Sequence, residues 1–181
     1  MARPGTHAKP GGRLLVFALT LGVCACRPAN QNAPADREAT SDPEVFYVRA
    51  AGGGTKDGSS WANALDGFPS LLERNAQYWV AAGQYRDYTF DDAPRGDFPI
   101  AVRKATPGAH GGDKGWKPEY ARGQAVFGPL RFSTGRYTFD GGEPNGIRVV
   151  GRMGAAAVVR IDATHVVLRQ VEIDGGFEKA D

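Results

Sequence analysis

The sequence predicts an all-β domain built from short strands. Glycine fills 25 of 181 positions without a collagen-like period, which indicates many tight turns. β-Branched and aromatic residues gather in short runs between these turns, as in strands. With 41% hydrophobic and 23% charged residues, the composition is that of a globular chain long enough for one domain.

Residues 1–25 have the composition of a secretory signal peptide. Arg3, Lys9 and Arg13 give a basic start without an acidic residue, and the apolar run LLVFALTLGVCA follows from Leu14 to Ala25. A membrane-spanning helix needs about 20 apolar residues, so this run is too short to span a bilayer. We therefore expect the segment to direct export and to be removed.

The sequence Val23-Cys24-Ala25-Cys26 resembles a bacterial lipobox, in which a cysteine is acylated and the chain is cut just before it. Cys26 matches that pattern better than Cys24, because the small Ala25 precedes it. The resemblance implies a lipid anchor to the membrane at Cys26. Since Arg27 rather than aspartate follows, it also implies an outer-membrane or cell-surface lipoprotein. Ordinary cleavage near Ala25 is the alternative, and would leave a periplasmic or extracellular protein.

Residues 26–44 are predicted to be the lipidated cysteine followed by a disordered tether. The stretch RPANQNAPADREATSDPE has three prolines and no large apolar side chain. It cannot bury enough surface to offset the entropy of ordering.

The predicted folded domain, residues 45–181, begins with a strand and a capping helix. Val45–Arg49 is β-branched and aromatic and ends in a glycine-rich turn. Ser60 is a candidate helix N-cap, and apolar residues then recur at intervals of three and four. The spacing predicts one amphipathic helix from Ser60 to Arg74.

Short strands fill the remainder of the domain, separated mostly by Gly, Pro, Asn or Asp. Residues 105–124 form an irregular insertion, which we expect to be anchored by the packing of Trp116 and Tyr120. The predicted strands are Tyr78–Ala82, Tyr85–Phe90, Ile100–Lys104, Ala125–Phe127, Leu130–Phe132, Tyr137–Asp140, Ile147–Val150, Ala156–Ile161, His165–Gln170 and Val171–Asp174.

A weak internal repeat favours stacking of these strands. Tyr137–Gly142 (YTFDGG) is echoed 34 residues later by Val171–Gly176 (VEIDGG). About three strands fit within one such period, as in a coil of a β-solenoid.

Four segments resemble the N-terminal region of right-handed parallel β-helix proteins of the pectate-lyase-like class: FYVRAAGGGTKDGSSWANAL, YWVAAGQY, IAVRKATPGAHGGDKGW with GQAVF, and HVVLRQVEIDGG. The resemblance covers Val45 to Asp181. It implies an incomplete β-helix whose open N-terminal end is covered by the first strand and the amphipathic helix. This fold hosts lyases, hydrolases, epimerases, tailspikes and adhesins, so it does not identify a reaction.

Alternation along the last predicted strands separates an apolar face from a polar one. The polar side chains could line a groove for an acidic sugar polymer, or form a solvated face with cross-strand ion pairs. The apolar set is Val159, Ile161, Val166, Leu168, Val171 and Ile173, and the polar, candidate ligand-facing set is Arg160, Asp162, His165, Arg169, Glu172 and Asp174.

The sequence predicts no resident cofactor and no defined metal site. Calcium is the one candidate ion, because Asp91, Asp92 and Asp97 could chelate it, but these residues lack the spacing of a defined calcium loop. His110 has no second histidine or cysteine nearby to complete a zinc site. No residue pattern assigns catalytic residues.

Two functions follow from these expectations. The first is an exported, lipid-anchored cell-envelope module that binds or scaffolds polysaccharide. The alternative is a fragment of a polysaccharide lyase or glycoside hydrolase whose catalytic coils lie downstream, so that this chain alone has no turnover. Removal of the signal leaves 19 basic against 20 acidic residues, a formal charge of −1, so nucleic acid is not an expected partner.

Overall fold

The computed structural model describes residues 42–176, which belong to the unit Ser41–Asp181. The predicted signal peptide, Cys26 and nearly all of the predicted tether lie outside the described residues. Within them the chain is all-β, and its named strands pair only in parallel. None of the described helices is long and apolar enough to cross a membrane.

The described part of the chain contains thirteen strands. Eight of them match a predicted strand to within one residue at each end. This agreement reflects the alternation of buried and exposed positions along each strand. They are β1 (Glu44–Arg49), β2 (Leu65–Asp66), β3 (Ala76–Val80), β4 (Gly83–Gln84), β5 (Tyr88–Phe90), β6 (Ile100–Lys104), β7 (Ala125–Phe127), β8 (Leu130–Phe132), β9 (Tyr137–Asp140), β10 (Ile147–Val150), β11 (Val159–Ile161), β12 (Val166–Arg169) and β13 (Val171–Asp174).

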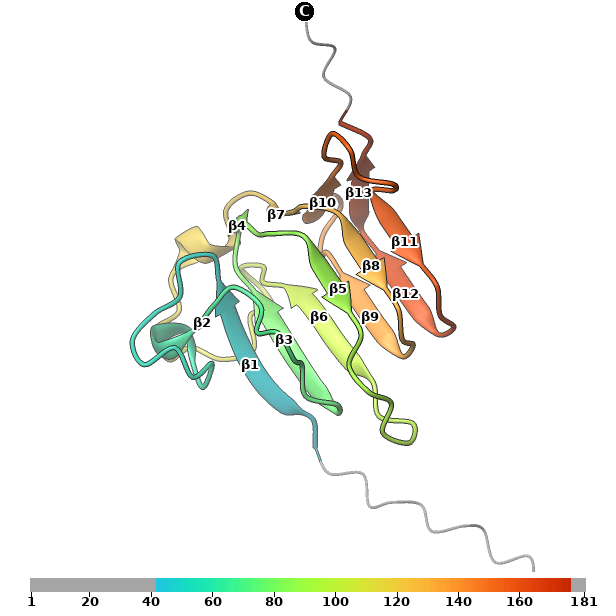
Figure 1. Cartoon of the computed structure of the whole chain (residues 1–181). Helices are drawn as coiled ribbons and strands as arrows, with labels where there is room; N and C mark the ends of the chain where they lie inside the picture. The colour runs from blue at the N-terminus through green and yellow to red at the C-terminus, as the bar shows by residue number, and fades with distance from the viewer. Residues whose placement is uncertain (1–41, 177–181) are drawn as a thin grey trace, which may run out of the picture. The chain divides into compact units, whose positions relative to one another are not determined.

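The strands form three sheets that the chain visits in turn (Figure 1). The six-stranded sheet has the order β12-β9-β6-β3-β1-β2, the four-stranded sheet β13-β10-β7-β4, and the three-stranded sheet β11-β8-β5. The three passes β3-β4-β5, β6-β7-β8 and β9-β10-β11 each contribute one parallel strand to every sheet. This stacked arrangement fits a β-helix-like solenoid.

The core lies between the three sheets and is rich in aromatic rings. Phe90 and Phe132, which pair in register on β5 and β8, stack with ring centroids 4.5 Å apart. Phe139 on β9 packs edge-on against both Phe90 and Phe127. Burial of such rings supplies the main stabilisation of a chain whose strands are this short.

The predicted amphipathic helix from Ser60 to Arg74 is wrong. This segment contains one 3₁₀ turn, η1 (Trp61–Asn63), then the two-residue strand β2, then irregular chain, and the other described 3₁₀ turn, η2 (Pro118–Ala121), lies in the insertion. Gly67 adopts a positive φ of 73° and Pro69 follows it, so α-helical hydrogen bonding cannot continue there. No capping helix is present within residues 42–176.

The apolar side chains of this segment nevertheless cover the core at its β1 end. Phe68 contacts the rings of Tyr78, Tyr88 and Phe127 with centroids 5.5 to 6.2 Å apart. Leu72 is buried in the same cluster. Side chains of an irregular segment therefore cover the end of the core that the sequence predicted a helix to cover.

The register implied by the internal repeat is also wrong. Tyr137–Asp140 belongs to the six-stranded sheet, whereas Val171–Asp174 belongs to the four-stranded sheet. Strand β9 pairs with β12, so Tyr137 lies opposite Val166. The stacking of about three strands per pass is confirmed, but the two similar motifs occupy different sheets because the turns between strands differ in length.

The insertion 105–124 is anchored on the outer face of the six-stranded sheet through the two predicted side chains. Trp116 and Tyr120 contact a buried cluster that includes Trp61 and Trp79. Gly111 makes the close approach possible, because it has a φ of 81° and a side chain there would lie 2.5 Å from the Trp79 ring.

The last strands are less covered than the sequence predicts. Ile161 and Ile173, which the sequence placed on the apolar face, are 47% and 53% exposed. They lie on β11 and β13, which are edge strands of their sheets in the described structure. Alternation correctly identifies the face of each side chain but not whether a neighbouring strand covers it.

Candidate functional site

Two adjoining pockets form a concave surface where the β4–β5 turn meets the strands of the three-stranded sheet. They have volumes of about 370 Å³ and about 320 Å³ and share Asp87 and Tyr88. We call this surface the Asp87 groove. Its aromatic and charged lining residues are Asp66, Phe68, Tyr85, Arg86, Asp87, Tyr88, Arg131 and Arg160.

The aromatic floor of the groove is held by buried contacts. The Tyr85 hydroxyl donates to the Ala81 carbonyl at 2.9 Å, and the Tyr88 hydroxyl donates to the Pro69 carbonyl at 2.6 Å. Burial raises the pKa of both phenols well above the usual value, so they stay neutral. Both residues line the pocket walls, so their rings can supply apolar contact to a ligand.

Two arginines project side by side from the outer face of the three-stranded sheet. Arg131 on β8 pairs in register with Arg160 on β11, so their Cα atoms lie on adjacent strands, about 5 Å apart. Asp162 accepts from Nε of Arg131 at 3.0 Å and from Nε of Arg160 at 2.8 Å. The hydrogen bonds from Arg160 and then Arg131 lower the pKa of Asp162.

This shared carboxylate orients both guanidinium groups through their Nε atoms and leaves their Nη atoms unused. Within the described residues no hydrogen bond uses the Nη atoms of Arg131 or Arg160. Each arginine therefore keeps donors available for an anionic ligand. Such a pair can bind carboxylate or sulfate groups that are spaced like adjacent strands.

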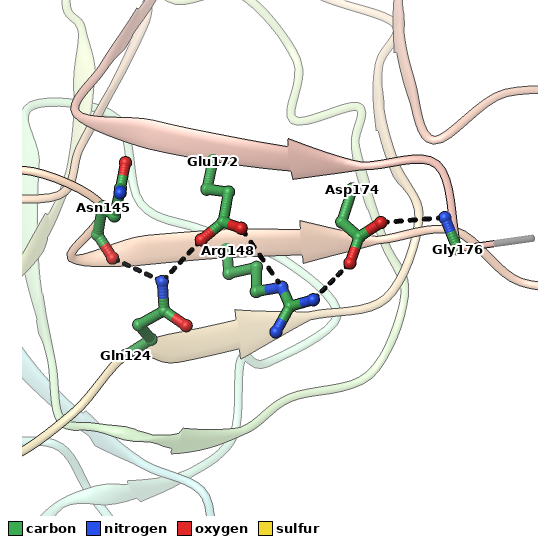
Figure 2. Close-up of polar contacts among 6 residues, drawn as sticks. All are labelled: Gln124, Asn145, Arg148, Glu172, Asp174 and Gly176. Carbon is green, nitrogen blue, oxygen red and sulfur yellow. Dashed lines mark hydrogen bonds and ion pairs between the residues drawn. The ribbon is translucent and has the colours of Figure 1, made fainter. Parts of the chain in front are cut away.

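A second polar cluster crosses the outer face of the four-stranded sheet (Figure 2). Gln124 donates to Glu172 Oε2 at 2.8 Å, and Arg148 Nε lies 3.7 Å from Glu172 Oε1. Arg148 also pairs with Asp174, and this hydrogen bond raises the pKa of Arg148 and lowers that of Asp174. These contacts join β10, β13 and the residue before β7, as in a structural ion-pair ladder, although Arg148 Nε itself has no hydrogen-bond partner among the described residues.

The six residues predicted to face a ligand do not form one stripe. Arg160 and Asp162 lie at the three-stranded sheet, Glu172 and Asp174 on the four-stranded sheet, and Arg169 on the six-stranded sheet. His165 precedes β12 with a φ of 57°, and its Nδ1 lies 3.0 Å from Thr164 Oγ1. The sequence prediction treated consecutive strands as one surface, whereas each strand turns onto another sheet.

The sequence prediction missed most of the groove. Tyr85, Asp87 and Tyr88 lie where a short strand turns into the next, and Arg131 lies on a strand whose partner is far along the sequence. The outward position of Arg131 between Leu130 and Phe132 was readable from alternation. Its pairing with Arg160 was not, because that requires the register between passes.

Two of the three acidic candidates for calcium binding have other partners. Asp92 is buried and accepts the Tyr137 hydroxyl at 2.8 Å, while Asp97 pairs with Arg136 at 2.5 Å. In residues 42–176 no group of three or more His, Cys, Asp or Glu side chains is arranged to hold a metal ion.

Comparisons of the chain with models of protein families, with curated proteins and with solved structures give no match. The Asp87 groove itself presents the rings of Tyr85 and Tyr88, the exposed Asp87, which pairs with Arg152, and the neighbouring Arg131 and Arg160.

Proposed function

We propose that this chain is an exported, lipid-anchored cell-envelope protein whose folded domain binds or scaffolds polysaccharide. The single observation that carries this proposal is the Asp87 groove, where aromatic rings lie beside arginines with unused donors. Aromatic faces suit sugar rings, and guanidinium groups suit the carboxylates of an acidic polymer.

We further propose that the domain is a right-handed parallel β-helix of the pectate-lyase-like class. The repeated order of the three sheets supports this, because each pass returns to the six-stranded sheet in parallel. Parallel crossover connections are right-handed in nearly all proteins. The sequence segments that resemble this class include β1, β3, β6 and the last two strands.

Location at the outer membrane or cell surface is the remaining part of the proposal. It rests on the basic and apolar start of the chain, followed by Ala25-Cys26 and Arg27. A lipid anchor followed by a polar tether would hold a glycan-binding domain close to the envelope polymers.

The proposal predicts binding of polygalacturonate, which carries one carboxylate per sugar. Affinity electrophoresis or calorimetry of the purified protein should detect binding that weakens by about fivefold in Arg131→Ala and in Arg160→Ala. Arg122→Ala is the matched control, because Arg122 is exposed in the insertion, outside both pockets. Equal binding by all three variants would contradict the assignment of the groove.

The same samples test the alternative, a polysaccharide lyase or glycoside hydrolase. Unsaturated products or new reducing ends, formed by the wild type and lost in Arg160→Ala, would replace the binding function by an enzymatic one. Incubation with and without calcium shows whether such turnover depends on this ion.

A further inference from the structure

The outer face of the six-stranded sheet carries a second charged row, distinct from the Asp87 groove. Arg103 on β6, Asp140 on β9 and Arg169 on β12 pair in register, one on each of three consecutive strands. All three positions point outward, because their neighbours Val102, Phe139 and Leu168 pack in the core. The row therefore has the order Arg–Asp–Arg.

Neither guanidinium group of this row has a partner in the described part of the chain. Neither the Arg103 nor the Arg169 side chain forms a hydrogen bond or ion pair with any residue between 42 and 176. Asp140 uses Oδ1 to accept the Gly142 amide at 2.9 Å. Among the described residues none donates to its Oδ2.

A flat uncharged strip runs beside this row. It consists of the outward residues two positions earlier on each strand, with Val45 and Val167 at its ends 38% and 39% exposed. In register order the strip is Val45, Gln77, Ala101, Thr138 and Val167. It contains no charge and no large side chain, so a flat molecule can lie along it.

We propose that this face binds an acidic polysaccharide that carries its anionic group on every second sugar. Strands lie about 4.8 Å apart, so Arg103 and Arg169 are about 10 Å apart along the stack. A sugar ring in an extended glycan advances by about one strand spacing. Anionic groups on alternate sugars then meet the two arginines, and the rings lie on the uncharged strip.

Asp140 sets the selectivity of this face. A polymer with a charge on every sugar would place one carboxylate against Asp140, and like charges in such close register repel. A neutral sugar at that position instead donates a hydroxyl hydrogen bond to the free carboxylate oxygen. Polygalacturonate and single-stranded DNA, which have a charge on every unit, therefore bind this face weakly.

The test compares hyaluronate, with one carboxylate per two sugars, with polygalacturonate and a single-stranded DNA oligonucleotide, each titrated into the purified protein. Hyaluronate affinity should fall by about fivefold in Arg103→Ala and in Arg169→Ala and by about twentyfold in the double variant. Arg122→Ala should leave it unchanged, and the losses in Arg103→Ala and Arg169→Ala should be as large in the groove variant Arg131→Ala/Arg160→Ala as in the wild type. The groove and this face are thereby judged separately.

The variant Asp140→Asn tests the selectivity of this face, because it is expected to increase binding. In the Arg131→Ala/Arg160→Ala background, polygalacturonate should bind more tightly once Asp140 is neutral, while the fold keeps its Gly142 contact through the amide oxygen. The proposal would be overturned if the hyaluronate affinity stayed unchanged in Arg103→Ala and Arg169→Ala, or if it fell equally in Arg122→Ala. Wild-type binding of DNA or polygalacturonate through Arg103 and Arg169 as tight as that of hyaluronate would also overturn it.

Discussion

Asp92 shows how a single buried residue joins three segments of the chain. It is 2% exposed, accepts the Leu72 amide at 2.5 Å and accepts the Tyr137 hydroxyl at 2.8 Å. Arg74 donates to the carbonyls of Asp92 and Gly135 beside it. The sequence indicated Asp92 only as a calcium candidate, because none of these long-range partners is visible without the fold.

At this scale we predict that Tyr137→Phe destabilises the fold. Burial raises the pKa of Tyr137 to about 12, so the neutral hydroxyl is the donor to Asp92 throughout the physiological range. Removing it leaves a buried carboxylate oxygen without that donor, at a cost of about 2 kcal/mol. Urea unfolding measures the loss. Tyr120→Phe is the control, since no described hydrogen bond uses the Tyr120 hydroxyl. Equal urea-unfolding midpoints for the two variants would contradict the role of Asp92.

At the scale of elements, strands were predictable and the helix was not. The boundaries of β6 to β10 follow from alternation of buried and exposed residues, a local property of the sequence. Residues 60–74 have helical spacing too, yet Leu65 pairs with Val48 of β1 and Gly67 turns with a positive φ. A long-range pairing outweighed the local preference, which no single-segment pattern reveals.

The irregular chain and the predicted helix imply different mutational effects in this segment. Phe68 packs on the core, so Phe68→Ala should lower the free energy of unfolding by about 2 to 3 kcal/mol, less than for a fully buried ring. Leu71 is 63% exposed, so Leu71→Ala should change it by less than about 0.5 kcal/mol. Chemical denaturation of both variants decides the matter. A loss in Leu71→Ala as large as that in Phe68→Ala would support the amphipathic helix instead.

At the scale of the whole molecule, the sequence indicated stacked strands but not which strands stack. The β6–β7 connection has 20 residues, whereas β12 and β13 are separated by Gln170 alone. Because connections differ this much, no fixed period aligns the passes, and the YTFDGG and VEIDGG motifs fall on different sheets. Both proposed glycan surfaces depend on register between passes, so neither could be assembled from sequence.

The last prediction concerns how the whole molecule is placed in the cell. The basic start, the short apolar run and Ala25-Cys26 occur in the order required for export and acylation. One acyl-bearing cysteine with its diacylglycerol supplies the two-chain anchoring that stable membrane attachment needs. Metabolic labelling with a fatty-acid probe should therefore mark the wild type and spare Cys26→Ser, with Cys24→Ser as the matched control that stays labelled. Label that persists in Cys26→Ser would show that Cys26 is not the acylated residue. Label that disappears in Cys24→Ser but not in Cys26→Ser would assign the anchor to Cys24. The envelope proposal would then rest on the export signal only.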